Sequence, residues 1–205
     1  MNKKTVKDLD IKGKKVLVRV DINVPLSKEN KGEIADDTRI KAALPTIDYL
    51  LDNGAKVILM SHLGRPKGEA NPEFALKPVA DWLENHYGDK FHFLPSPEVV
   101  DDEVIRKTAD LKEGELALLE NTRYIAGETK NDEEFSKKLA SLAELFVNDA
   151  FGTSHRAHSS NVGVASLLPS AVGFLIEKEI EVMGKALEDP CLLYTSPSPR
   201  DATLS

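Results

Sequence analysis

Short apolar runs alternate along the chain with longer stretches in which apolar residues recur at helical spacing. Apolar runs with the length of buried strands lie at residues 15–20, 56–60, 90–94, 115–119 and 145–148, with a shorter extended candidate at 170–174. Helical spacing fills the intervals at residues 37–53, 76–87, 98–109, 132–142 and 177–187. This alternation predicts an α/β fold with three layers, in which a Rossmann-like parallel sheet has helices on both faces.

Glycine and proline refine the expected helix boundaries. Gly54 follows the first helical stretch, where a glycine commonly ends a helix. Pro45 lies inside that stretch and predicts either a kink or a late start, because proline cannot donate a backbone hydrogen bond. Pro78 is tolerated, since it falls in the first turn of the next stretch.

Polar residues cluster directly after four of the predicted strands. The strings are RVDINVP at 19–25, SHLGRP at 61–66, ENTR at 120–123 and DAFGTSHRAH at 149–158. In a doubly wound sheet, ligands bind beyond the carboxyl ends of the strands. We therefore expect Arg65, Arg123, Arg156 and the histidines to meet at one rim. Arg39, at the start of the first helical stretch, can join them.

The residue types at this rim indicate a small polyanionic ligand. Arginine presents a planar fork of donors that pairs with carboxylate or phosphate, and several arginines around one cavity repel each other unless an anion fills it. Gly64, Gly152 and Pro66 allow tight turns and close backbone approach. Asp21 and Asn23 are acceptors among these donors, suited to a substrate hydroxyl, although Asp21 could instead orient an arginine.

Each of these residues also has a purely structural interpretation. A single surface arginine is usually solvated or weakly paired. Arg19 alternates with buried valines and could point to the other face of the sheet, Asp149 could cap a turn, and His155 and His158 could be structural histidines. The histidines are poor metal ligands, because no zinc spacing is present and the sole cysteine is Cys191. The same composition at four strand ends favours a ligand site.

Composition and charge exclude several classes of protein. The chain has 205 residues, of which 41% are hydrophobic and 30% charged, with a formal net charge of −7. An acidic balance argues against general nucleic-acid binding, although it leaves room for a local basic pocket. A single cysteine and the absence of a signal-peptide or membrane-spanning apolar run predict a cytoplasmic protein without a membrane partner. The sequence contains neither a Walker-type loop nor a G-x-G-x-x-G turn after a strand, so it shows no recognisable nucleotide site.

Four long motifs together resemble the N-terminal half of the phosphoglycerate kinases. They are VRVDINVPL, SHLGRPKG, LLENTRY followed by GE and ND, and VNDAFGTSHRAHSS, and they occur in the order found in that family. The string GFLIEKEIEVMGKAL resembles the helix that leads from that domain to the second one. The departures are small: Tyr124 stands where the family usually has Phe, and Ser154 and Ser159 where small residues such as Ala are common.

This resemblance implies a glycolytic enzyme that transfers a phosphoryl group between 1,3-bisphosphoglycerate and ADP to give 3-phosphoglycerate and ATP, with Mg²⁺ accompanying the nucleotide. Asp21 and Asn23 would contact the hydroxyl and carboxyl end of 3-phosphoglycerate, and Arg39 would steady the phosphoryl group in transfer as the catalytic residue. The 3-phosphate would be gripped mainly by a basic patch formed by His62, Arg65, Arg123, His155 and Arg156. Members of the family are generally monomers, so we expect a monomer.

The resemblance also divides the chain. Residues 1–175 match the 3-phosphoglycerate-binding domain and residues 176–190 the interdomain helix. Residues 191–205 break the pattern with Ser-Pro pairs, and 191–201 resembles a translated sequencing adapter, so we expect a non-native tail rather than a disordered linker. The family's G-G-A-K-V stretch, its nucleotide-contacting lysines and its magnesium ligand, which belong to the second domain, do not occur in this sequence. We therefore expect the chain by itself to bind no nucleotide or metal and to be inactive.

Two other functions compete with this interpretation. A non-catalytic anion-binding or regulatory module could use the same fold, since a fold does not determine function. A Rossmann-type dehydrogenase is disfavoured, because the G-x-G-x-x-G turn is missing and the rim offers arginines rather than a site for hydride transfer.

Overall fold

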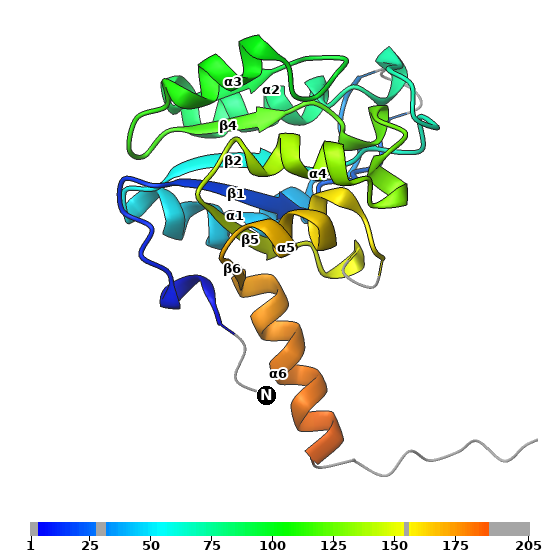
Figure 1. The fold of residues 1–205 in the computed structure, drawn as a ribbon. Helices are drawn as coiled ribbons and strands as arrows, with labels where there is room; N and C mark the ends of the chain where they lie inside the picture. The colour runs from blue at the N-terminus through cyan, green and yellow to red at the C-terminus, as the bar shows by residue number, and fades with distance from the viewer. Residues whose placement is uncertain (1–3, 28–31, 154–155, 189–205) are drawn as a thin grey trace, which may run out of the picture.

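Six parallel strands form a single sheet in this computed structural model, which describes residues 4–27, 32–153 and 156–188 (Figure 1). The strands are β1 (Lys15–Val20), β2 (Lys56–Met60), β3 (Phe91–Leu94), β4 (Leu116–Leu119), β5 (Leu145–Asp149) and β6 (Ser170–Val172). Their order across the sheet is β3-β4-β2-β1-β5-β6, and every neighbouring pair is parallel. The expected α/β class is confirmed.

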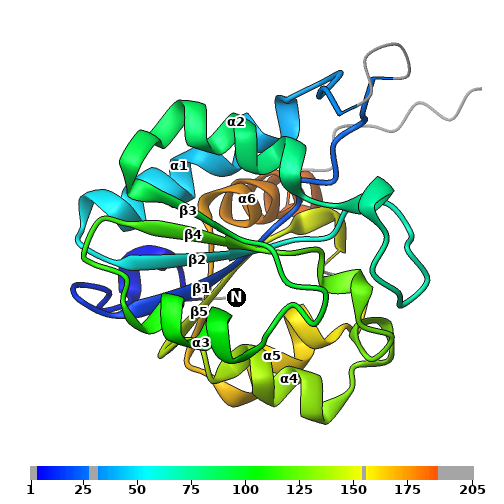
Figure 2. The same cartoon turned by 90° about the horizontal axis from the view of Figure 1, so that it is seen from above.

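Helices cover both faces of the sheet and complete the three expected layers (Figure 2). One face carries α1 (Thr38–Asp52), α2 (Lys77–Tyr87) and α6 (Phe174–Glu188), and the other α3 (Asp102–Ala109), α4 (Glu133–Ala140) and α5 (Val164–Leu167). Short 3₁₀ turns lie at Val6–Asp8, Pro72–Phe74, Gly88–Lys90, Thr122–Tyr124, Glu128–Lys130 and Phe151–Thr153, and a π-helical turn lies at Ser159–Gly163. No helix in these described ranges is long and apolar enough to span a bilayer.

Alternate residues of each strand pack into two separate cores. In β1, Val16 and Val18 contact the core beneath α1 and α2, whereas Leu17 belongs to the core beneath α3 and α4. Both cores are mostly aliphatic, and their buried side chains are closed to solvent. This two-sided burial is the reason that the strands are continuous apolar runs, as is usual for a parallel sheet between helix layers.

The strand boundaries agree closely with the sequence prediction, whereas several helix ends differ. Helix α1 begins at Thr38 and continues through Pro45, so the predicted late start is wrong. Helix α3 begins at Asp102 rather than at residue 98, because Val99 has a left-handed φ of 62° and Asp101 caps the helix by accepting from the Val104 amide at 2.8 Å.

Helix α6 begins at Phe174, three residues before its predicted start at 177. Its first amides are capped by side chains from distant elements. The Phe174 amide donates to Thr46 Oγ1 at 3.0 Å, and the Leu175 amide donates to Asp149 Oδ1 at 2.9 Å. A cap supplied by another strand and another helix leaves no local sequence pattern.

The strand order reverses between β1 and β5. From β1 the chain passes through α1 to β2 on one side, whereas from β5 it passes to β6 on the other. The two strands pair in register up to Val20 opposite Asp149, so the segments that follow them start side by side. A reversal of this kind leaves a crevice at the carboxyl edge, where ligands of doubly wound sheets bind.

Candidate anion-binding site

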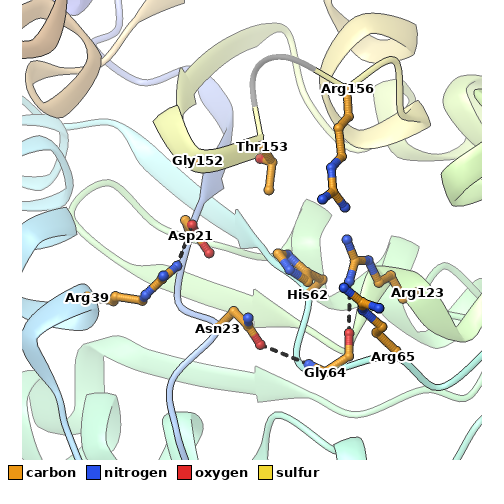
Figure 3. Close-up of a pocket in the computed structure, with 10 residues that line it drawn as sticks. All are labelled: Asp21, Asn23, Arg39, His62, Gly64, Arg65, Arg123, Gly152, Thr153 and Arg156. Carbon is orange, nitrogen blue, oxygen red and sulfur yellow. Dashed lines mark hydrogen bonds and ion pairs between the residues drawn. The ribbon is translucent and has the colours of Figure 1, made fainter. Parts of the chain in front are cut away.

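A pocket of ≈ 250 Å³ opens at this carboxyl edge (Figure 3). It is lined by residues that follow β1, β2, β4 and β5 or begin α1, namely Asp21, Asn23, Arg39, His62, Gly64, Arg65, Arg123, Gly152, Thr153 and Arg156. Every site residue expected from the sequence is in this set except His155, which lies outside the described residues. The strand ends therefore meet as predicted.

Asp21 and Arg39 form an ion pair at one end of the pocket. Arg39 Nη1 donates to Asp21 Oδ2 at 2.7 Å, and the Arg39 side chain remains 53% exposed. Asp21 Oδ1 is buried and has no hydrogen-bond partner among the described residues. Asp21 thus orients an arginine, as one of the two sequence interpretations proposed, and still has a free acceptor oxygen. A Cβ at Gly152 would lie 2.8 Å from Asp21 Oδ2, so a larger residue there would displace the Asp21 carboxylate.

Three arginines, Arg65, Arg123 and Arg156, gather at the opposite end, with His62 between them and the Asp21–Arg39 pair (Figure 3). They come from the segments after β2, β4 and β5. Burial, and then the nearby charge of Arg156, lowers the pKa of Arg123. With one carboxylate and four guanidinium groups, the pocket carries excess positive charge that an anion would offset.

The peptide groups of Gly64 hold the two ends of the pocket together. The Gly64 amide donates to Asn23 Oδ1 at 2.9 Å, and Arg123 Nη1 donates to the Gly64 carbonyl at 2.9 Å. Gly64 has a φ of +59°, and a Cβ there would collide with the Phe74 ring. Because Asn23 Oδ1 accepts from Gly64, its side-chain NH₂ is the group that remains for a ligand.

His62 is a neutral member of the pocket. Burial, followed by the positive charges of Arg19 and Arg123, lowers the pKa of His62 to about 2. Its Nδ1 lies 3.0 Å from Arg19 Nη2. The basic patch expected from the sequence therefore owes its charge to the arginines, and His62 contributes a hydrogen-bonding ring.

Comparison with known proteins places the chain in a family. The family model described as phosphoglycerate kinase matches residues 6–194. The chain belongs to the phosphoglycerate kinase family.

Individual phosphoglycerate kinases resemble the chain over nearly its whole length. The enzyme of Finegoldia magna is 62% identical over 196 residues, which is 96% of this chain and 49% of the relative. The enzyme of Thermosipho africanus is 56% identical over 190 residues, which is 93% of this chain and 46% of the relative. The solved phosphoglycerate kinase of Coxiella burnetii superposes with a TM-score of 0.80 at 36% identity, covering 92% of this chain and 46% of that one. The chain spans about half the length of the curated phosphoglycerate kinases that it matches.

Sequence reasoning missed a buried polar network beside the pocket. Arg19 does point away from Val18 and Val20, as its alternation predicted, but there it contacts His62 and Ser160. Ser160 in turn donates to Glu128, a fully buried carboxylate. A charged residue inside a buried strand requires polar partners. This requirement is the signal in the sequence that could have indicated the network.

Two other residues singled out from the sequence lie outside the pocket. Asp149 caps α6, and burial raises the pKa of its carboxyl group. His158 is buried, with Nδ1 3.9 Å from Glu128 Oε1, and burial lowers its pKa. Asp149 thus has the structural role of a cap, whereas the buried His158 Nδ1 has no hydrogen-bond partner among the described residues. Over the described part of the chain, no group of three or more His, Cys, Asp or Glu side chains is placed to hold a metal ion.

Proposed function

We propose that this chain is the 3-phosphoglycerate-binding part of a glycolytic phosphoglycerate kinase, which transfers a phosphoryl group between 1,3-bisphosphoglycerate and ADP to give 3-phosphoglycerate and ATP. The observation that carries the proposal is the separation of charge in the pocket, with three arginines at one end and the Asp21–Arg39 pair at the other. 3-Phosphoglycerate likewise has a phosphate at one end, a carboxylate at the other and a hydroxyl between them.

The proposed binding mode assigns each group of the substrate to a part of the pocket. The 3-phosphate lies among Arg65, Arg123 and Arg156, whose forks suit phosphate oxygens, and beside His62. The hydroxyl and carboxyl end lies near the free Oδ1 of Asp21 and the side-chain NH₂ of Asn23. His155, outside the described residues, keeps its proposed place in this patch.

The proposed chemistry requires charge stabilisation rather than a general base. In the direction that phosphorylates 3-phosphoglycerate, the attacking group is a carboxylate, which is already ionised at neutral pH. The transition state needs in-line alignment and positive charge at the equatorial oxygens. Arg39 lies at the carboxyl end of the proposed substrate and remains half exposed, so its guanidinium can reach this charge as the catalytic residue.

The nucleotide and its Mg²⁺ are proposed to bind in the family's second domain. The donor set of the pocket does not fit Mg²⁺, because Asp21 is its single carboxylate and is paired with Arg39. We assign residues 1–175 to the substrate domain and 176–190 to the interdomain helix, and we expect the 205-residue chain by itself to be an inactive monomer. A cytoplasmic location accords with glycolysis.

Titration calorimetry on the 205-residue chain tests this function. We expect 3-phosphoglycerate to bind and ATP not to bind. Glycerate, which keeps the carboxylate and hydroxyl but lacks the phosphate, should bind at least ~10-fold more weakly, because each charge-assisted hydrogen bond contributes about 1.5–3 kcal/mol. Arg65→Ala should reduce the preference for 3-phosphoglycerate over glycerate. Equal affinity for the two acids, or robust ATP turnover by the chain, would refute the proposal.

A further inference from the structure

We infer that Arg19 is a positioning residue that acts through His62: it fixes the ring in the tautomer that carries its proton on Nε2, so that His62 offers a donor to the bound anion. Arg19 Nη2 lies 3.0 Å from His62 Nδ1. An arginine side chain has donors only, so Nδ1 must be the acceptor and the proton of the neutral ring must be on Nε2. The tautomer follows from this contact alone; its use in substrate binding rests on the proposed function.

Arg19 is held rigidly enough to enforce this choice. Its side chain is 1% exposed and does not line the pocket, so it cannot bind the anion itself. Nε donates to Ser160 Oγ at 2.9 Å and Nη1 donates to the Val20 carbonyl at 2.6 Å. These contacts leave Nη2 directed at the imidazole. The carboxyl end of β1 thereby fixes the orientation of a ring that follows β2.

A buried carboxylate balances the charge of Arg19. Ser160 links the two, since its Oγ accepts from Arg19 Nε and donates to Glu128 Oε1. The Ser160 amide also donates to Glu128 Oε2 at 3.0 Å, and the Thr122 hydroxyl donates to Oε1 at 3.3 Å. A buried guanidinium is strongly destabilising unless such a partner is present. The carboxylate of Glu128 opposes the lowering of the Arg19 pKa that burial causes.

The direction of the Nε2 proton matters because phosphate and carboxylate oxygens are acceptors. A ring with the opposite tautomer would turn a lone pair towards the anion and repel it. The charged or titratable groups that act on His62 are Arg19 on β1, Arg123 after β4, and Arg156 and His158 after β5. Burial and the charges of the three arginines lower the pKa of His62, so the ring does not take up a second proton. His62 therefore donates a hydrogen bond without being a cation.

Nuclear magnetic resonance of the imidazole nitrogens tests the tautomer directly in the 205-residue chain without ligand. The chain is labelled with ¹⁵N-histidine, and His62→Gln identifies the His62 signals. We expect a protonated Nε2 and an unprotonated Nδ1, unchanged between about pH 8 and pH 5, where an ordinary histidine titrates. A proton on Nδ1, or a His62 titration near the usual histidine pKa, would overturn the inference.

Matched variants separate positioning from general stability. Arg19→Met combined with Glu128→Gln removes both buried charges together, which avoids an unpaired charge. In this double variant we expect the His62 pKa to rise and the affinity for 3-phosphoglycerate to fall by about tenfold, the loss of one well-aligned hydrogen bond. Thr108→Val is the control, because it removes a buried hydroxyl on α3 that bonds only carbonyls of its own helix, and it should leave the ring spectrum unchanged and the affinity within about threefold.

The outcomes distinguish this inference from the proposed function. If the wild-type chain fails to bind 3-phosphoglycerate, the proposed function fails, but the ring spectrum still decides the tautomer. If the chain binds and the double variant keeps both the wild-type affinity and the wild-type ring spectrum, Arg19 has no positioning role. Circular dichroism checks that each variant is folded, and the wild-type spectrum is decisive even if the double variant is not.

Discussion

Replacing Arg39 with methionine is expected to lower kcat by about a thousandfold, the effect of removing an arginine from a phosphoryl-transfer transition state. Arg39 lies at the edge of the pocket with its guanidinium half exposed and oriented by Asp21. Its charge is therefore available where the transferred group accumulates negative charge. The KM for 3-phosphoglycerate should rise less than about tenfold, chiefly because Asp21 loses its partner and faces the substrate carboxylate.

Steady-state kinetics measure this effect in a protein that joins residues 1–190 to the second half of the Finegoldia magna relative. Lys41→Met is the matched control, since Lys41 is on the same helix, is exposed and pairs with Asp37 outside the pocket. The control should change kcat by less than about twofold, as expected for a surface ion pair. A rise in KM with kcat unchanged would show that Arg39 only binds substrate.

Arg123→Met is expected to weaken 3-phosphoglycerate binding by about a hundredfold. Arg123 is the most buried of the three arginines at the phosphate end, and its Nε has no hydrogen-bond partner among the described residues. The substitution removes a charge-assisted donor, worth about 1.5–3 kcal/mol, and also releases the Gly64 carbonyl that Arg123 holds at 2.9 Å. The fold should tolerate it, because repulsion from Arg156 is relieved.

Calorimetry of the 205-residue chain measures this loss, with Lys67→Met as the control. Lys67 is an exposed cation in the segment after β2, which also carries Arg65, and it does not line the pocket. Its removal changes the net charge by the same amount, so it reports the long-range electrostatic contribution, which salt screens. We expect a change of less than about threefold for the control. Similar losses for both variants would indicate general charge attraction instead of a phosphate contact.

The sequence was sufficient to predict the sheet and most of the pocket. Strands β1 and β2 start and end at the predicted residues, because a strand buried on both faces is a continuous apolar run. The carboxyl ends of parallel strands share one edge, so Arg65 and Arg123 could be predicted to line one pocket without knowledge of the strand order.

What the sequence could not predict depends on contacts between distant residues. Helix α6 starts early because Asp149 and Thr46 cap it, and neither is near it in the chain. His62 looked like part of a cationic patch, yet burial and Arg19 keep it neutral. The start of α6 and the charge of His62 both depend on solvation and on contacts with distant residues. Neither follows from residue type and spacing alone.

A crystal structure of the chain with 3-phosphoglycerate tests the central claim most directly. The account predicts the phosphate among Arg65, Arg123 and Arg156, with His62 Nε2 within hydrogen-bond distance of a phosphate oxygen or one bridging water. The hydroxyl and carboxyl end should lie towards Asp21 and Arg39. A ligand bound in the reverse orientation, or at another surface while this pocket holds only solvent, would contradict it.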